Sequence, residues 1–77
     1  MVALVAELTR HTSKSVTLEF DDGEVVDAVL LKVDSTEHDD ITFDVLRVRQ
    51  RVEGTRYDAR NVYVAPISTV RRVTLLE

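Results

Sequence analysis

Residues 16–24 read VTLEFDDGE, and this stretch decides the fold. Val16, Leu18 and Phe20 alternate with polar residues, which is the two-residue period of a β-strand with one buried face. The segment 21–24 that follows contains Asp-Gly, the specific signal of a hairpin turn. We therefore predict a strand, an exposed turn and a returning strand, in which the acidic residues of 21–24 serve the turn rather than catalysis.

The chain beyond this turn predicts long and bent strands. Residues 25–33 are apolar on both faces, as in a strand packed on two sides or one that bends strongly in a small barrel. The acidic segment 34–40 is predicted to be a loop. After it, Ile41, Phe43 and Val45 share one phase, whereas Leu46, Val48 and Val52 follow the opposite phase. Because side chains alternate with a period of two, this change predicts a bulge or a sharp bend near Val45 and Leu46.

The two ends of the chain complete the predicted fold. Residues 2–12 have helical spacing, with a strand as the alternative. Gly54 marks a turn, and a fourth strand begins at Tyr57 or Asn61 and runs to Ala65. Pro66 ends that strand, 67–70 form a short 3₁₀ turn, and 71–76 form the last strand. We expect one domain, 1–77, in the mostly β class: an N-terminal helix and five antiparallel strands curled into a small barrel, which leaves few open edges.

Composition narrows the classes of function. The 77 residues carry 14 acidic and 10 basic side chains, a net charge of −4. Residues 1–44 hold eleven acidic and three basic side chains, whereas residues 45–77 hold three acidic and seven basic ones. There is no cysteine and no long apolar run, so we expect a cytoplasmic protein without a membrane partner. A core this small supplies little stability without disulfides, which leads us to expect self-association.

The sequence predicts no catalytic or metal centre. The segment 37–40 holds carboxylates and His38, but the chain has only two histidines and no cysteine for zinc. Ser68 and Thr69 have no histidine nearby in the sequence to activate them as nucleophiles. We expect no cofactor, no metal and no enzymatic activity.

Several of these segments resemble the Sm-like family, which includes the Sm and LSm proteins and bacterial Hfq. The resemblance rests on an N-terminal helix, the 16–20 strand, the Asp22-Gly23 turn and a long second strand ending at Asp34. Residues 62–70, VYVAPISTV, also resemble the Hfq segment that joins the last two strands. The resemblance implies a small barrel that assembles into a ring and an association with RNA.

The chain departs from the family at its RNA-binding positions. Asp40 lies near the position where Sm proteins carry an asparagine that binds a base. Val64 and Ala65 occupy the positions of the Lys-His pair that follows the tyrosine in Hfq, and the Arg-Gly pair of the Sm signature is absent. The family pattern therefore predicts the fold and the ring better than it predicts RNA binding.

Cationic and aromatic residues in the second half are the candidate ligand contacts. Arginines two residues apart share one face of a regular strand and could follow a phosphate backbone, while tyrosines could stack on bases. The alternative is that the arginines pair across strands with Asp27, Asp44 or Asp58. The candidate contacts with RNA or another ligand are Asp40, Arg47, Arg49, Arg51, Tyr57 and Tyr63.

Two functional hypotheses follow. In the first, the fourth strand of one copy pairs with the fifth strand of the next to form a homo-oligomeric ring, as the resemblance implies. The predicted interface residues are Asn61, Val62, Tyr63, Val64, Arg71, Val73 and Leu75. In this reading Arg71 and Arg72, being adjacent, point to opposite faces of the last strand. In the second hypothesis, the same strand order is an SH3-like barrel that binds another protein through a groove lined by tyrosines.

Overall fold

The computed structural model describes residues 2–76. The chain begins with helix α1 (Val2–Arg10), followed by β1 (Ser15–Phe20), β2 (Val25–Asp34) and β3 (Asp40–Gln50). After a long connection come β4 (Val62–Pro66), the 3₁₀ turn η1 (Ile67–Thr69) and β5 (Val70–Leu75). The mostly β class with one N-terminal helix and five strands is confirmed, and α1 ends two residues earlier than the sequence pattern predicted.

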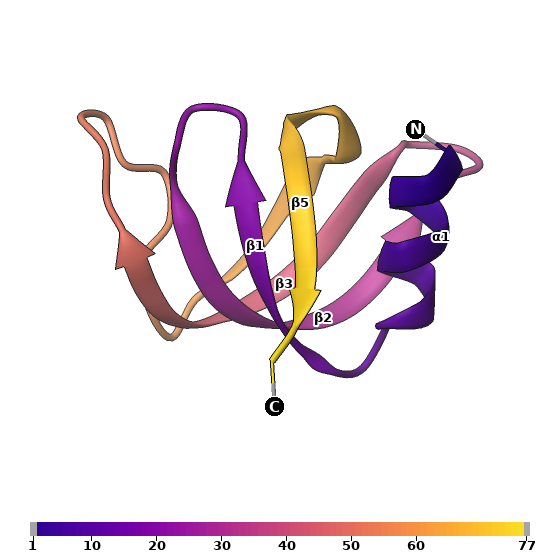
Figure 1. The fold of residues 1–77 in the computed structure, drawn as a ribbon, viewed down its shortest axis with the longest axis horizontal. Helices are drawn as coiled ribbons and strands as arrows, with labels where there is room; N and C mark the ends of the chain where they lie inside the picture. The colour runs from indigo at the N-terminus through magenta and orange to yellow at the C-terminus, as the bar shows by residue number, and fades with distance from the viewer. Residues whose placement is uncertain (1, 77) are drawn as a thin grey trace.

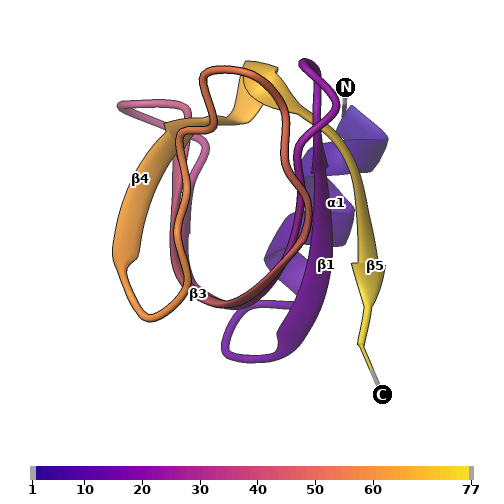
Figure 2. The ribbon, with the colours of Figure 1, turned by 90° about the vertical axis from the view of Figure 1, so that its left-hand side faces the viewer.

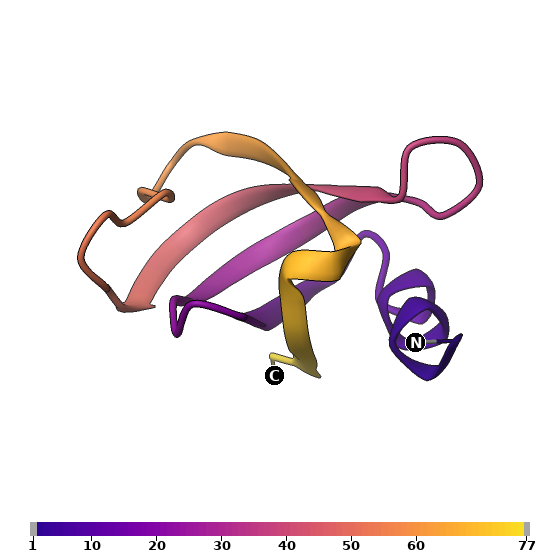
Figure 3. The same cartoon turned by 90° about the horizontal axis from the view of Figure 1, so that it is seen from above.

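The five strands form one antiparallel sheet in the order β4-β3-β2-β1-β5. The sheet curls strongly, so that β3 and β4 lie opposite β1 and β5 across the core (Figure 2, Figure 3). β4 and β5 are the two outer strands of this sheet and are not paired with each other. Within residues 2–76, no helix has the length and apolar character needed to cross a membrane.

The predicted turn at 21–24 joins β1 and β2. The Phe20 N–H donates to the Glu24 carbonyl at 2.9 Å, and the Gly23 N–H donates to the Phe20 carbonyl at 3.1 Å. Gly23 has φ +97°, a conformation that a residue with a side chain adopts only with strain. The glycine in this turn therefore sets the register of the first hairpin.

The predicted change of phase in the third strand is a β-bulge. Val45 pairs with Ala28, but the next pair joins Arg47 to Asp27, so Leu46 is an extra residue. Other irregularities were not predicted: Arg49 and Leu31 are also extra residues in the pairing of β3 with β2, and β5 has a bulge of its own. Val70 pairs with Phe20 and Arg72 pairs with Glu19, which leaves Arg71 as the extra residue. Arg71 and Arg72 are consequently both exposed, and the prediction that they point to opposite faces of the strand is wrong.

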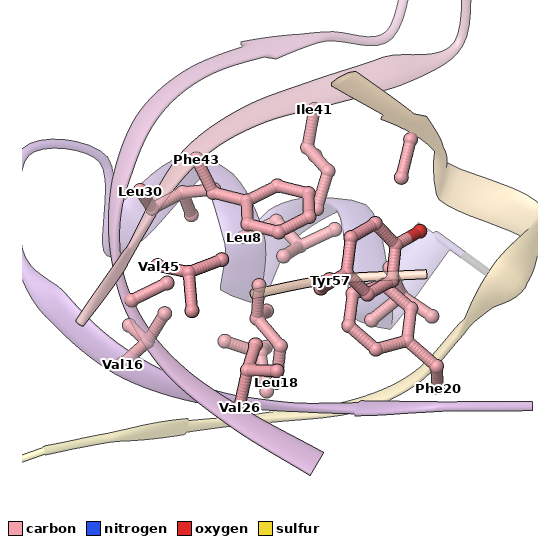
Figure 4. Close-up of a cluster of buried hydrophobic side chains, with 14 of the residues drawn as sticks. Leu8, Val16, Leu18, Phe20, Val26, Leu30, Ile41, Phe43, Val45 and Tyr57 are labelled. Atoms are coloured by element: carbon pink, nitrogen blue, oxygen red, sulfur yellow. The ribbon is translucent and has the colours of Figure 1, made fainter. Parts of the chain in front are cut away.

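One apolar cluster fills the curled sheet (Figure 4). It contains the alternating residues of β1 and the first phase of β3, as the sequence pattern predicted. Leu8 of α1 is fully buried in this cluster, and Leu4 and Val5 pack against it. The helix therefore closes one side of the core, and Figure 1 shows it beside β5.

Candidate functional site

The two outer strands present unpaired edges. β4 carries no charged residue, and its Val62 and Val64 are 57% and 62% exposed. Leu75 on β5 is 39% exposed. Exposed apolar edges are templates for pairing with another strand, and monomeric proteins usually block them with charges, proline or a covering element. Here β4 contains Pro66, β5 carries the exposed Arg71 and Arg72, and α1 contacts β5, so the apolar part of the edges is confined to Val62, Val64 and Leu75. These edges are therefore the strongest candidate for an interaction site.

The predicted interface residues are distributed unevenly along these edges. Val62, Val64 and Leu75 are among the most exposed large apolar residues of the described chain. Tyr63 is half-buried, Asn61 and Arg71 are exposed, and Val73 is buried in the core. The predicted residues therefore lie on or next to the two outer strands, which are at opposite ends of the sheet.

Two of the candidate arginines converge on Asp27 of β2. The Arg49 Nε lies 2.7 Å from Asp27 Oδ1, and an Arg47 terminal nitrogen lies 3.2 Å from Asp27 Oδ2. The Thr17 hydroxyl donates to the same carboxylate at 2.7 Å. Burial raises the pKa of Asp27, but the hydrogen bonds from Arg49 and Thr17 and the charges of both arginines outweigh it, so the pKa lies below its ordinary value. We call these four residues the Asp27 cluster.

A third arginine, Arg56, joins the long connection before β4 to the first turn. The carboxylate of Glu24, which is fully buried, accepts hydrogen bonds from the Arg56 backbone N–H and from Arg56 Nε, each at 2.9 Å. Arg56 also lies 3.0 Å from Asp22. Its guanidinium carbon lies 5.2 Å from the centre of the Tyr57 ring and 5.6 Å from that of Phe20. We call Arg56, Glu24 and Asp22 the Arg56 clasp.

The clasp corrects one expectation. The sequence pattern placed Glu24 in an exposed turn, but the folded connection covers it completely. A carboxylate that is out of water needs a partner, and Arg56, 32 residues away, supplies it. The pKa of Arg56 is raised first by its hydrogen bond to Glu24.

The two candidate tyrosines belong to an aromatic cluster in the interior. The Tyr57 ring is 5% exposed and lies 4.8 Å from Phe20 and 5.3 Å from Phe43, measured between ring centres (Figure 4). Burial raises the pKa of its hydroxyl. Tyr63 lies 5.0 Å from Tyr57, and its hydroxyl accepts a hydrogen bond from the Asp58 N–H at 2.9 Å. In this arrangement the Tyr57 ring is not free to stack on a base.

The remaining candidates do not meet in one place. Arg51 pairs with Asp58 at 3.1 Å on the exposed connection. Asp40 begins β3 at the other end of that strand. The predicted loop before it is closed by Asp34, whose carboxylate accepts hydrogen bonds from the Thr36 and Glu37 N–H groups and lies 3.0 Å from His38 Nδ1. The structure therefore separates the candidate ligand contacts into local ion pairs and loop contacts.

Ligand atoms of Asp34, Glu37 and His38 lie within 4.8 Å of one another, which is close enough to consider a metal. The hydrogen bond from His38 lowers the pKa of Asp34, and the contact with Asp34 raises the pKa of His38. A neutral imidazole is needed to bind a metal, and the shift favours the protonated form. The hydrogen bonds that Asp34 makes within the loop account for the closeness of Asp34, Glu37 and His38.

A cleft of about 510 Å³ lies between α1 and η1. Its apolar wall is formed by Leu4, Val5, Ile67 and Val70, and His38 lies among its polar residues. The cleft borders the start of β5 and therefore adjoins one of the open edges.

Comparison with known proteins identified no matching family model, curated protein or solved structure. No matched protein therefore contributes to the description of the site, which rests on the structure of this chain. Sequence reasoning missed the clasp, because Glu24 reads as an ordinary turn residue. The Asp27 cluster could have been expected from the sequence, because Asp27 is the only charged residue among the first seven positions of the apolar segment 25–33 and a charge there needs a partner.

Proposed function

We propose that the protein is an Sm-like assembly module whose copies join through β4 and β5 into a homo-oligomeric ring. The observation that carries this proposal is the pair of open edges at opposite ends of one sheet, with exposed Val62, Val64 and Leu75. Because the two edges differ, contact between them is head-to-tail, and head-to-tail contacts produce either a closed ring or an open filament. The strong curl of the sheet favours closure.

The native mass tests this proposal. Light scattering coupled to size exclusion at tens of micromolar should give one discrete multiple of the 8.7 kDa chain. A mass that rose without limit with concentration would favour a filament, and a monomer would overturn the proposal. Negative-stain images of the same fraction should then show closed particles.

RNA is the ligand that the family resemblance implies for such a ring. Arg47, Arg49 and Arg51 each have an acidic partner in the chain, which reduces the positive charge that they offer to phosphates. We therefore assign assembly, rather than RNA binding, as the primary function. Gel shifts with uridine-rich and adenosine-rich RNA at low and high salt test the secondary role. Absence of a shift at low salt would exclude these RNAs as ligands.

The alternative, an SH3-like barrel that binds peptides as a monomer, needs exposed aromatic side chains in a groove. Tyr57 is buried, and the Tyr63 hydroxyl already has a partner at 2.9 Å. These positions support the ring rather than the groove. A monomeric native mass together with changes in the NMR signals of Tyr63 on adding a proline-rich peptide would reverse this preference.

A further inference from the structure

The cleft between α1 and η1 has the size and the apolar surface of a small-molecule site. Its volume is about 510 Å³, and pockets that hold small ligands measure roughly 300–1,000 Å³. Leu4 and Val5 of α1 contribute apolar surface on one side, and Ile67 and Val70 contribute it on the other. The proposed function assigns no role to this cleft.

Three polar residues line the same cleft. His38 and Asp39 come from the loop between β2 and β3, and Ser68 comes from η1. The His38 Nδ1 lies 3.0 Å from the Asp34 carboxylate and is already occupied. Within residues 2–76, the Asp39 carboxylate and the Ser68 hydroxyl have no hydrogen-bond or ion-pair partner. Acceptor oxygens are therefore available beside an apolar surface.

Asp39 is held at the cleft by its backbone. Its carbonyl accepts a hydrogen bond from the Ile67 N–H at 2.8 Å, which ties the β2–β3 loop to η1. Ser68 follows Ile67 directly, so the same hydrogen bond keeps Asp39 close to the Ser68 hydroxyl. The two free oxygen groups therefore belong to one side of the cleft rather than to separate loops.

The charge around the cleft is negative. Segment 34–40 carries four carboxylates and one imidazole, and Asp34 balances the charge of a protonated His38. The other acids of the segment are Glu37, Asp39 and Asp40. Two contributions oppose them: the charge of Lys32 acts on His38, and a helix N-terminus such as that of α1 carries about half a positive charge. These contributions are smaller than three carboxylates, so the cleft favours a cation over an anion.

We propose that this cleft binds a small organic cation in which a primary ammonium group is attached to an apolar chain. The chain lies against Leu4, Val5 and Ile67, and the ammonium donates hydrogen bonds to the Asp39 carboxylate and the Ser68 hydroxyl. An ammonium has three N–H donors and no acceptor, which matches the acceptors that the cleft leaves available. The inference does not depend on the proposed ring.

Three probes with the same alkyl tail test the choice of head group: n-octylammonium, n-octanol and n-octanoate. Titrations followed through the amide NMR signals of Leu4, Val5, Ser68 and Val70 report both the affinity and the place of binding. We expect n-octylammonium to bind about tenfold more tightly than n-octanoate, because unit charges a few ångströms apart near a protein surface differ by at least that much in attraction and repulsion.

Asp39→Asn tests the residue that provides the charge. Asp39 has φ +53°, and asparagine tolerates this left-handed region as aspartate does, so the variant should keep the fold. Its affinity for n-octylammonium should fall about three- to fivefold, as expected for an exposed ion pair, while its affinity for n-octanol stays unchanged. Asp44→Asn on β3 is the matched control, because Asp44 does not line the cleft, and it should bind all three probes as the wild type does.

Three results would overturn the proposal. These are equal or tighter binding of n-octanoate, an Asp39→Asn variant that binds n-octylammonium as the wild type does, and unchanged cleft signals at millimolar n-octylammonium. Each of them leaves the proposed ring intact, because the ring is judged by its native mass.

A neighbouring copy of the chain is the alternative occupant of the cleft. The variant Val64→Lys places a charge on the β4 edge and should stay monomeric. If n-octylammonium binds this variant but not the assembled wild type, the neighbouring copy fills the cleft and the proposal is wrong. Equal binding by both forms supports the cation site, and it does so even if the wild type is a monomer and the proposed ring fails.

Discussion

The Arg56 clasp and the β4 edge differ in how many of their polar groups find a hydrogen-bond or ion-pair partner within the chain. At the clasp, a fully buried carboxylate has two hydrogen bonds from one arginine, and a second acid lies 3.0 Å from the same guanidinium. At the β4 edge, two valines are more than half exposed and their backbone groups have no partner among residues 2–76. Charge is therefore mainly used to hold this fold together, whereas apolar side chains of the β4 edge stay exposed.

The largest expected effect on stability is at the clasp. Arg56→Ala leaves Glu24 buried without its cation, and breaking a buried pair costs 3–5 kcal/mol in general. Because Arg56 itself is partly exposed, we expect about 3 kcal/mol of lost unfolding free energy, measured by urea denaturation. Arg51→Ala removes an exposed pair with Asp58 and should cost less than about 1 kcal/mol. Equal losses in both variants would contradict the distinction between the two pairs.

The Asp27 cluster should give the next largest effect. Asp27→Asn keeps the shape of the side chain but removes its charge, and we expect a loss of about 1–2 kcal/mol because hydrogen bonds to charged groups are weakened. Arg47 and Arg49 remain partly solvated, which limits the loss. Asp44→Asn is the matched control, since Asp44 lies on the same sheet face and has no ion pair within residues 2–76. Its unfolding free energy should change by less than about 0.5 kcal/mol.

The pH dependence of stability checks the same cluster. The pKa of Asp27 in the folded chain lies below that in the unfolded chain. Its stabilisation is therefore present above the ordinary aspartate pKa of about 3.9 and is lost as the pH falls through the folded value. The difference in unfolding free energy between the wild type and Asp27→Asn should shrink between pH 7 and pH 3. A difference that stays constant would show that the charge of Asp27 contributes nothing.

At the β4 edge, we expect a small effect on folding and a large effect on assembly. Val64→Lys changes an exposed side chain, so the unfolding free energy of the isolated chain should change by about 0.5 kcal/mol or less. A lysine on an edge strand opposes pairing with another strand, and light scattering should give a monomer. Leu31→Lys is the control, because Leu31 is also exposed but lies on β2, the middle strand of the sheet. It should assemble as the wild type does.

The smallest expected effect concerns His38. Its hydrogen bond to Asp34 raises its pKa above 6.5, so its contribution to stability is complete below that value and disappears as the pH rises through the folded-state pKa. NMR titration of the His38 ring should show the raised pKa in the wild type. In Asp34→Asn it should return toward the ordinary value. An unchanged titration would mean that the contact does not persist in solution.

The alternation of apolar residues, the Asp-Gly turn and the change of phase near Val45 determined the strands, the first hairpin and the bulge at Leu46. These features depend on neighbours within a few residues, so they are visible in the sequence. The bulge at Arg71 was missed, although Val70 and Val73 are both buried and lie three residues apart. Two arginines between two valines give no indication of which residue is extra until β1 is placed beside them.

Only the tertiary structure decided how the charged and aromatic residues are used. Arg49 meets Asp27 across 22 residues, and Arg56 meets Glu24 across 32, because strand register and the path of one long connection bring them together. The same connection places Tyr57 in the core. The sequence by itself determined which strands form. The curl and order of the sheet decided that Arg47, Arg49 and Arg56 are paired internally and that β4 and β5 remain open, since these outcomes depend on contacts between segments far apart in the chain.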